Sequence, residues 1–283
     1  LALAHDIGHP PFAHAGEAEL NRQMERFGEH FDHNLHALRI VETFEHRYAR
    51  FPGLNLTFEV REGIVKHSRD FEPGEVPELD EFLPGLRPPL EAQLIDLCDE
   101  AAYDTADLDD AWSAGFLTLD ALREGVPRFA EIYERAEMQF PGAPAEIQFS
   151  EAVRSMLNWL VGTLIDGTYQ AATAAGVEQV DDVRRFPRRL ASFLPGISET
   201  TGQLRAMLRR DVYLSKVVAT ERRDSTVKIA RLFDFFLAHP DKLPENYQAE
   251  ADRQALHRTV CDYIAGMTDG FFLRTYQQML GDG

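Results

Sequence analysis

The sequence predicts an all-α protein, and two observations carry that prediction. Apolar residues recur at intervals of three and four along most of the 283-residue chain, which is the period of a helix with one buried face. No alternating apolar and polar run bounded by hairpin turns is found. At 44% hydrophobic residues, the chain is long enough to bury a sizeable core.

Helices are expected in eight stretches. In chain order they cover residues 20–27, 34–51, 60–68, 90–108, 118–137, 150–176, 224–239 and 258–280. Stretches rich in proline and glycine separate some of them, at 71–89, 139–144 and 239–247. A short helix is also expected before Pro10 and Pro11, where it must end because the proline ring removes a donor and clashes with the preceding turn.

Composition limits the classes of function. Twenty-nine Lys and Arg against 47 Asp and Glu give a net charge of −18, which opposes strong binding to nucleic acid. No apolar run is long enough to cross a membrane, and the two cysteines form no disulfide framework, so a cytoplasmic protein is expected. The chain starts without an initiator Met, on apolar residues typical of the middle of a helix, and we expect the natural N-terminus to lie upstream.

The most informative stretch is HDIGHPPFAHAGE, residues 5–17. His5 and Asp6 are adjacent, so on a helix both could reach one ion, and a neutral imidazole with a carboxylate suits Mn, Fe, Co or Mg. His9 would lie one turn after His5. Beyond the prolines, His14 and Glu17 would lie one turn apart on a second helix. This crowding predicts a metal site with acid–base side chains beside it.

A second stretch, DLCDEAAYDTADLDD at residues 96–110, places Asp99, Tyr103 and Asp107 on one face of a helix. Two acids and an aromatic residue at this spacing fit either a ligand-binding face or an ordinary solvated stripe. Spacing alone does not separate the two interpretations. A metal site that needs a distant carboxylate favours the first.

Five ordered motifs resemble the dGTPase family of HD-domain phosphohydrolases, the deoxyguanosine-triphosphate triphosphohydrolases. The resemblance runs from residue 1 to about 280 and rests on LAHDIGHPPFAHAGE, FDHNLHALRIVE, LTFEVREGIVKHS, AQLIDLCDEAAYDTADLDDA and CDYIAGMTDG. It implies an HD-domain helical bundle with additional C-terminal helices. Residues 1–115 would form the catalytic core, and residues 116–283 a helical region that completes the active site and makes oligomer contacts.

The family pattern also implies roles for individual residues. His5, Asp6 and Asp99 match the metal ligands, while His14 and Glu17 match the catalytic pair and His33 an additional active-site histidine. On the substrate side, Tyr103 matches the aromatic residue that packs on the deoxyribose, Asp107 the acid that binds the 3′-hydroxyl, and Lys66 and Arg39 the phosphate contacts.

The resemblance implies metal-dependent hydrolysis of dGTP or other dNTPs to a deoxynucleoside and tripolyphosphate, with Mn, Mg, Co or Fe as the divalent ion. A homo-oligomer is expected, with an effector dNTP as a candidate second partner. Four features depart from the family pattern: a further histidine ligand expected upstream of His5, His36 in place of glutamine, GMTDGF at residues 266–271 in place of an ending with arginine and an aromatic residue, and Ser215 and Lys216 in place of a His-Pro pair.

Two other functions fit parts of the pattern. One is another HD phosphohydrolase that acts on nucleoside monophosphates, alarmones or cyclic dinucleotides. The other is a non-catalytic relative that senses nucleotides or acts as a scaffold.

Overall fold

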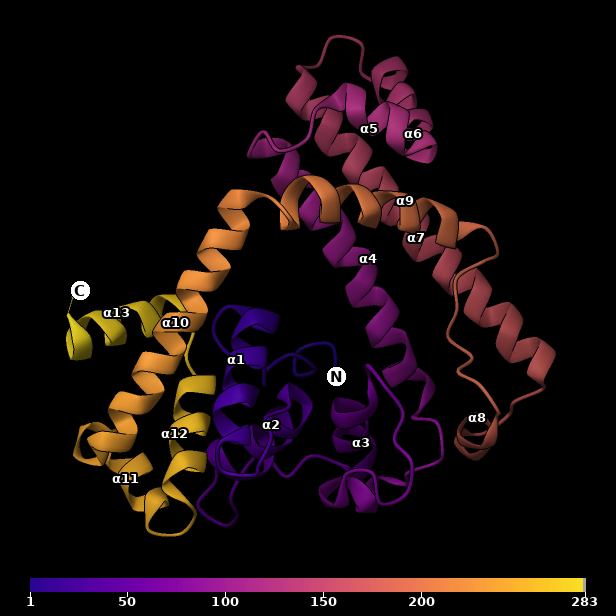
Figure 1. Cartoon of the computed structure of the whole chain (residues 1–283). Helices are drawn as coiled ribbons and strands as arrows, with labels where there is room; N and C mark the ends of the chain where they lie inside the picture. The colour runs from indigo at the N-terminus through magenta and orange to yellow at the C-terminus, as the bar shows by residue number, and fades with distance from the viewer. Residues whose placement is uncertain (282–283) are drawn as a thin grey trace. The chain divides into compact units, whose positions relative to one another are not determined.

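The computed structural model describes residues 1–281. Within these residues all the regular secondary structure is helical (Figure 1), which confirms the predicted all-α fold. The chain divides into two compact units. One contains Leu1–Val65 and the segment from Ala219 onward, and the other contains Lys66–Val218. The predicted division after residue 115, into a catalytic core and a helical region that completes the active site, stays a prediction.

The first unit is built from an N-terminal and a C-terminal group of helices. Its elements are α1 (Ala13–Glu25), α2 (His33–Arg39), η1 (Ile40–Phe44), α3 (Phe58–Lys66), α10 (Lys216–Ala238), η4 (Pro240–Lys242), α11 (Glu245–Ala251), α12 (Leu256–Ala265) and α13 (Asp269–Leu280). Both α3 and α10 extend slightly across the unit boundary.

A single apolar cluster holds these two groups together. Leu20 and Met24 of α1 are buried with Phe233 and Phe236 of α10, and the cluster also includes residues of α12 and α13. Burying a side chain of this size stabilises the fold by about 1.5–3 kcal/mol. The packing therefore fixes α1, which carries His14 and Glu17, against the C-terminal helices.

The second unit is organised around two long helices, α4 (Leu90–Ser113) and α7 (Ala145–Ala175), with α5 and α6 near one end of them (Figure 1). Its other elements are η2 (Pro77–Phe82), α5 (Leu119–Gly125), α6 (Pro127–Gln139), α8 (Val180–Arg185), α9 (Ile197–Leu208) and η3 (Arg209–Tyr213). Trp112 of α4 stacks on Phe149 of α7 with ring centroids 4.1 Å apart, inside the apolar core of this unit.

Two predicted helices are each divided in two. The stretch 118–137 breaks between α5 and α6 at Val126, because Pro127 has no N–H to continue the first helix. The stretch 258–280 breaks between α12 and α13, where the side chain of Thr268 accepts a hydrogen bond from the backbone N–H of Phe271 and caps the second helix.

The predicted helix 34–51 is shorter than expected, because it ends at Phe44. The chain folds back on it: the N–H of Leu54 donates to the carbonyl of Val41 at 2.7 Å. Gly53 permits this return. Its φ is +64°, and a Cβ there would lie 2.4 Å from the same carbonyl oxygen.

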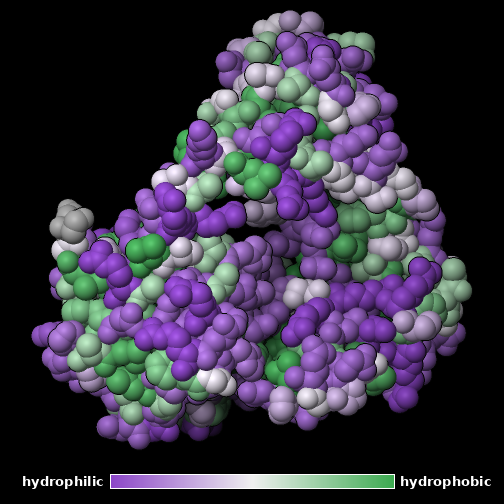
Figure 2. Space-filling view, in the orientation of Figure 1, coloured by the Kyte–Doolittle hydropathy of each residue, from purple (hydrophilic) through white to green (hydrophobic). Residues whose placement is uncertain are grey.

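Hydrophilic side chains cover most of the face seen in Figure 2, as the net charge of −18 leads one to expect. Among residues 1–281, none of the helices has the length and apolar character that crossing a membrane requires.

Candidate active site

The segment before Pro10 forms a series of turns, so the helix predicted there is wrong. The backbone N–H of His5 donates to the carbonyl of Leu1, and that of His9 donates to the carbonyl of Asp6. Proline at two successive positions removes the donors a helix needs, and the residue before a proline disfavours helical backbone angles. His5 and His9 are therefore placed by turns rather than by a shared helix face.

Gly8 brings this turn segment against α2. A Cβ at Gly8 would lie 2.0 Å from the carbonyl oxygen of His33 and 2.4 Å from the backbone nitrogen of Ala37, so no other residue type fits without movement. Gly16 has the same function in α1, where a Cβ would meet the carbonyl oxygen of Pro11 at 1.9 Å. The approach at Gly8 places residues 5–9 against α2, and the approach at Gly16 places Pro11 against the first turn of α1.

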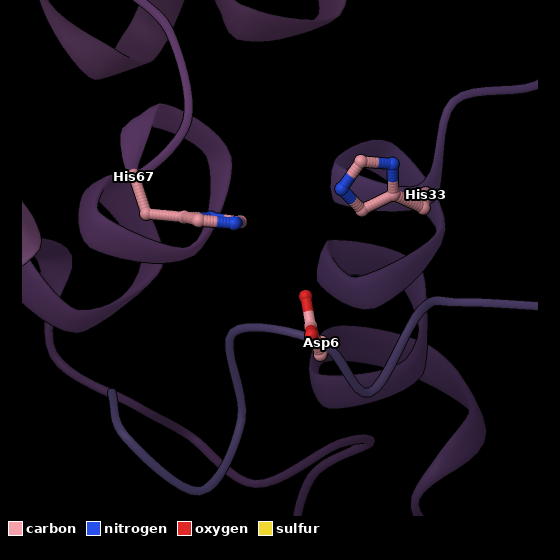
Figure 3. Close-up of side chains that lie close together, drawn as sticks. All are labelled: Asp6, His33 and His67. Carbon is pink, nitrogen blue, oxygen red and sulfur yellow. The ribbon is translucent and has the colours of Figure 1, made fainter. Parts of the chain in front are cut away.

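Asp6 lies between two histidines of the turn segment. Its Oδ2 atom is 3.5 Å from Nε2 of His5, and its Oδ1 atom is 3.2 Å from Nδ1 of His9. Figure 3 shows the Asp6 carboxylate on this segment and the His33 ring at the start of α2. A ligand atom of Asp6 and one of His33 lie within 4.8 Å of each other.

Glu17 lies between His14 and His33 and contacts both rings. Its Oε1 atom accepts hydrogen bonds from the backbone N–H of His33 at 3.0 Å and lies 2.6 Å from Nδ1 of that ring, while its Oε2 atom is 3.4 Å from Nδ1 of His14. Burial alone would raise the pKa of Glu17, but the hydrogen bonds and charge of His33, with the bond to His14, lower it to about 2. Glu17 is therefore an anion at neutral pH and orients both rings.

His9 lies between the His5–Asp6 pair and the group of His14, Glu17 and His33, although no functional role was predicted for it. Its ring stacks on that of His33 with centroids 4.0 Å apart and lies edge-on to that of His14 at 5.4 Å. Burial opposes a charge on His9, but Asp6 and the charge of Glu17 prevail and raise its pKa. The short HxxxxH spacing in the sequence was the available signal.

The side chains of this cluster suit a divalent cation. Imidazole nitrogens and carboxylate oxygens are the donors that Mn, Fe, Co and Mg accept, and one such atom from each of His9, His14 and Glu17 lies within 4.8 Å of the others. The donor atoms of His5 and Asp6 are equally close together. Five predicted site residues of this unit therefore lie together: His5, Asp6, His14, Glu17 and His33.

Arg39, the predicted phosphate contact, is partly exposed and pairs with the buried carboxylate of Asp262. Its guanidinium bonds both carboxylate oxygens of Asp262 and also donates to Oε1 of Gln254 at 2.9 Å. Burial would raise the pKa of Asp262, but the hydrogen bond from His36 and the charge of Arg39 prevail and lower it. His9, His36 and Asp262 line the same pocket of about 380 Å³, together with Phe44 and Tyr247.

The second unit carries the predicted residues of α4. Asp99 and Tyr103 are exposed and share a helix face with Asp107. The hydroxyl of Tyr213 donates to Oδ2 of Asp107, and Tyr213 also bonds Tyr103. Burial and these bonds raise the pKa of Tyr213 far above its usual range. Tyr213, which was not predicted, therefore ties the aromatic residue to the acid.

Lys66 is fully buried within the second unit. Its ammonium donates to the carbonyls of Leu83 at 2.8 Å and Leu86 at 3.0 Å. The guanidinium of Arg189 in turn donates to the carbonyl of Lys66. In this arrangement the Lys66 charge is directed at backbone oxygens, and its role as a phosphate contact stays a prediction.

Comparison with known proteins places these residues in a family. An HD domain model matches residues 1–104, and a phosphohydrolase-associated domain model matches residues 191–278. Proteins named deoxyguanosinetriphosphate triphosphohydrolase-like protein are similar over the whole chain. The relative from Geobacter sulfurreducens is 40% identical over 279 residues, which are 99% of this chain and 72% of that protein.

Two further relatives with the same name extend the comparison. One from Azoarcus sp. strain BH72 is 41% identical over 284 residues, covering 100% of this chain and 74% of the relative, and one from Leptospira interrogans is 34% identical, covering 99% and 73%. Because both the domain models and these near full-chain relatives agree, the chain belongs to the deoxyguanosinetriphosphate triphosphohydrolase-like family of HD-domain, metal-dependent phosphohydrolases.

Proposed function

We propose that this protein hydrolyses deoxynucleoside triphosphates, dGTP or other dNTPs, to a deoxynucleoside and tripolyphosphate. The name that its relatives carry supports this substrate class. The observation that carries the proposal is the Glu17 carboxylate held between His14 and His33, beside the His5–Asp6–His9 group. This arrangement combines metal-binding side chains with an oriented acid–base histidine.

His14 is the proton-transfer group in this proposal. Its side chain is 82% exposed, so it can approach the α-phosphate and the 5′-oxygen of a bound nucleotide. Glu17 holds Nδ1 of His14 and stays ionised, so it stabilises the protonated ring during transfer. His33 fixes the carboxylate of Glu17 in turn. A positioned acid–base group of this kind typically contributes about 10²–10⁴-fold to the rate.

His5 and Asp6 are the proposed protein ligands of the divalent ion, with Asp99 as the third ligand that the family pattern supplies. When bound, such an ion polarises a phosphoryl oxygen and lowers the pKa of a water molecule. Asp6 is held beside both His5 and His9, so its carboxylate is oriented before any ion binds.

The remaining predicted residues would bind the nucleotide. Tyr103 would pack against the deoxyribose and Asp107 would accept a hydrogen bond from its 3′-hydroxyl, while Lys66 and Arg39 would offset phosphate charge. The bond from Tyr213 to Asp107 supports this assignment, because it orients a carboxylate that has a second oxygen for a sugar hydroxyl. We also propose that the protein is cytoplasmic, forms a homo-oligomer and has an effector dNTP as a candidate partner.

The test is a ³¹P NMR experiment on the protein with dGTP and Mn²⁺. Tripolyphosphate without pyrophosphate or free phosphate would support the proposed reaction. The His14→Ala variant under the same conditions should form tripolyphosphate far more slowly. Pyrophosphate or phosphate as the product would assign the protein to another class of HD phosphohydrolase.

If no product forms with dGTP, even with other dNTPs added as activators, the proposed hydrolysis is wrong. Binding of dNTPs without turnover, measured by calorimetry, would then support the nucleotide-sensing alternative.

A further inference from the structure

We propose that His9, His14 and Glu17 form a second divalent-cation site, distinct from the His5–Asp6 pair and suited to Zn²⁺. One donor atom from each of the three side chains lies within 4.8 Å of the other two. Two neutral imidazoles and one carboxylate, with one open position, are a ligand set that zinc accepts in proteins.

The distance between His14 and Glu17 supports this assignment. Nδ1 of His14 and Oε2 of Glu17 are 3.4 Å apart, which is long for a charge-assisted hydrogen bond. Two donors that bind one tetrahedral zinc ion at about 2.0–2.1 Å lie roughly 3.3 Å from each other. The pair is therefore already at the separation that one ion requires.

The local sequence explains why these two side chains converge. His14 and Glu17 are three residues apart on α1 and share a face of the helix. A glutamate and a histidine at this spacing, in the reverse order, hold metal ions in helical di-iron and di-manganese proteins. Because His14 is largely exposed, its ring can rotate onto an ion without loss of core packing.

The third ligand, His9, has the support that ligating histidines need. Its Nδ1 atom lies 3.2 Å from Oδ1 of Asp6. Metal-bound histidines usually direct the non-ligating nitrogen at a carboxylate in this way, and the other nitrogen then carries the lone pair. Glu17 is likewise held, because its Oε1 atom bonds His33 and leaves Oε2 toward the site.

An ion at this site would have a regulatory consequence, which rests on the proposed function of His14. A metal-bound imidazole cannot accept or donate a proton, so Zn²⁺ that fills the site should lower turnover by about the 10²–10⁴-fold that the acid–base group contributes. Mn²⁺ binds nitrogen ligands more weakly than Zn²⁺ and should leave His14 free.

The experiment counts bound ions and needs no substrate. The protein is dialysed against a series of free Zn²⁺ concentrations, and the metal bound per chain is measured by mass spectrometry. We expect the His14→Ala variant to bind one Zn²⁺ fewer than the unmodified protein, and the Glu17→Gln variant to do the same. His30→Ala is the matched control, because His30 is an exposed histidine outside the cluster, and it should bind the full number.

A second readout tests the ligands directly. Co²⁺ in a four-coordinate site with nitrogen and oxygen donors absorbs visible light, and this absorption should weaken in His14→Ala and persist in His5→Ala, because His5 is not a ligand of the proposed site. If His14→Ala binds as many Zn²⁺ ions as the unmodified protein, the second site does not exist. The two proposals can fail separately. If the unmodified protein hydrolyses dGTP as proposed but has no second Zn²⁺, only the second site is wrong. If it binds the second Zn²⁺ but does not hydrolyse dGTP even without Zn²⁺, only the proposed function is wrong.

Discussion

The histidine cluster of the first unit and the α4 stripe of the second unit are built in different ways. The cluster collects His9, Glu17 and His33 from a turn segment and two helices, and it depends on close backbone contacts at Gly8 and Gly16. The stripe of Asp99, Tyr103 and Asp107 lies along a single helix, α4. A contact that crosses three segments requires tertiary packing, whereas a stripe needs only the helical period.

This difference predicts how each region responds to substitution. In the cluster, side chains orient one another, so the loss of one member should disturb several neighbours. On α4, each residue is placed by the helix backbone, so substitutions should act separately except where Tyr213 joins Tyr103 and Asp107. Five substitutions test the comparison, and they are described from the largest expected effect to the smallest.

The largest effect is expected for Asp6→Ala. The substitution removes a proposed metal ligand and the partner of both His5 and His9. Charge stabilisation by a metal ion is worth several kcal/mol, so turnover should fall by at least about 10³-fold, and bound Mn²⁺ should be lost in parallel. Metal analysis and product assays on the same sample measure both, with the exposed Asp252→Ala as control. If the variant retained both the metal and its turnover, Asp6 would not be a metal ligand.

His14→Ala should separate chemistry from assembly of the cluster. We expect turnover to fall by about 10²–10⁴-fold while the ion held by His5 and Asp6 remains. The exposed position of His14 predicts an unchanged unfolding temperature, because little packing is lost. Steady-state kinetics and thermal unfolding provide the two readouts. Turnover at the level of the unmodified protein would disprove the proposed proton-transfer role.

Arg39→Ala should destabilise the first unit, because it leaves the buried Asp262 carboxylate without its principal cation. The expected loss is about 3–5 kcal/mol in the free energy of unfolding. Arg47→Ala, which breaks an exposed pair with Glu45, is the control and should cost no more than about 1 kcal/mol. Urea unfolding at pH 7 measures both.

The same substitution has a defined pH dependence. The pKa of Asp262 is lowered on folding from its ordinary value of 3.8, so its contribution to stability is present above that pH and is lost as the pH falls through the folded-state pKa. The stability difference between the unmodified protein and Arg39→Ala should therefore shrink on acidification below about pH 4. A difference that grows on acidification would contradict the assigned charge state.

Gly8→Ala tests the close approach that assembles the cluster. The added methyl group would meet the backbone of His33 and Ala37, and we expect a loss of about 1–3 kcal/mol in stability together with weaker metal binding. Gly162→Ala on α7 is the matched control. Its Cβ would have open space, so this substitution should stabilise the helix by about 0.5–1 kcal/mol. Equal effects of the two substitutions would show that Gly8 is not a packing requirement.

Tyr103→Ala should have the smallest effect on structure and a selective effect on substrate choice. Without the ring against the deoxyribose, the ratio of kcat/KM for dGTP to that for GTP should fall by about 10-fold or more, since one lost packing contact is worth about 1–3 kcal/mol. Tyr103→Phe keeps the ring and should preserve the ratio. An unchanged ratio in Tyr103→Ala would remove this residue from the sugar site.

Most of the fold could be predicted from the sequence, because it depends on local periodicity. The apolar period identified α4 and α7, and the motifs identified the family before any geometry was considered. The helices α8, α9 and α11 lie outside the predicted stretches, and three further errors fell where one residue overrides the period. Pro127 divides one predicted helix, Thr268 caps the second half of another, and the return of the chain through Gly53 shortens a third.

The sequence by itself determined which side chains are available for chemistry, and on α4 also how they are spaced, because a helix converts sequence separation directly into direction. The tertiary structure decided which of them meet. The stacking of His9 on His33, the bond between Glu17 and His33 and the pairing of Arg39 with Asp262 join residues 16 to 223 positions apart. No period encodes such contacts, because they arise only when core packing and backbone fit at Gly8 and Gly16 bring separate segments together.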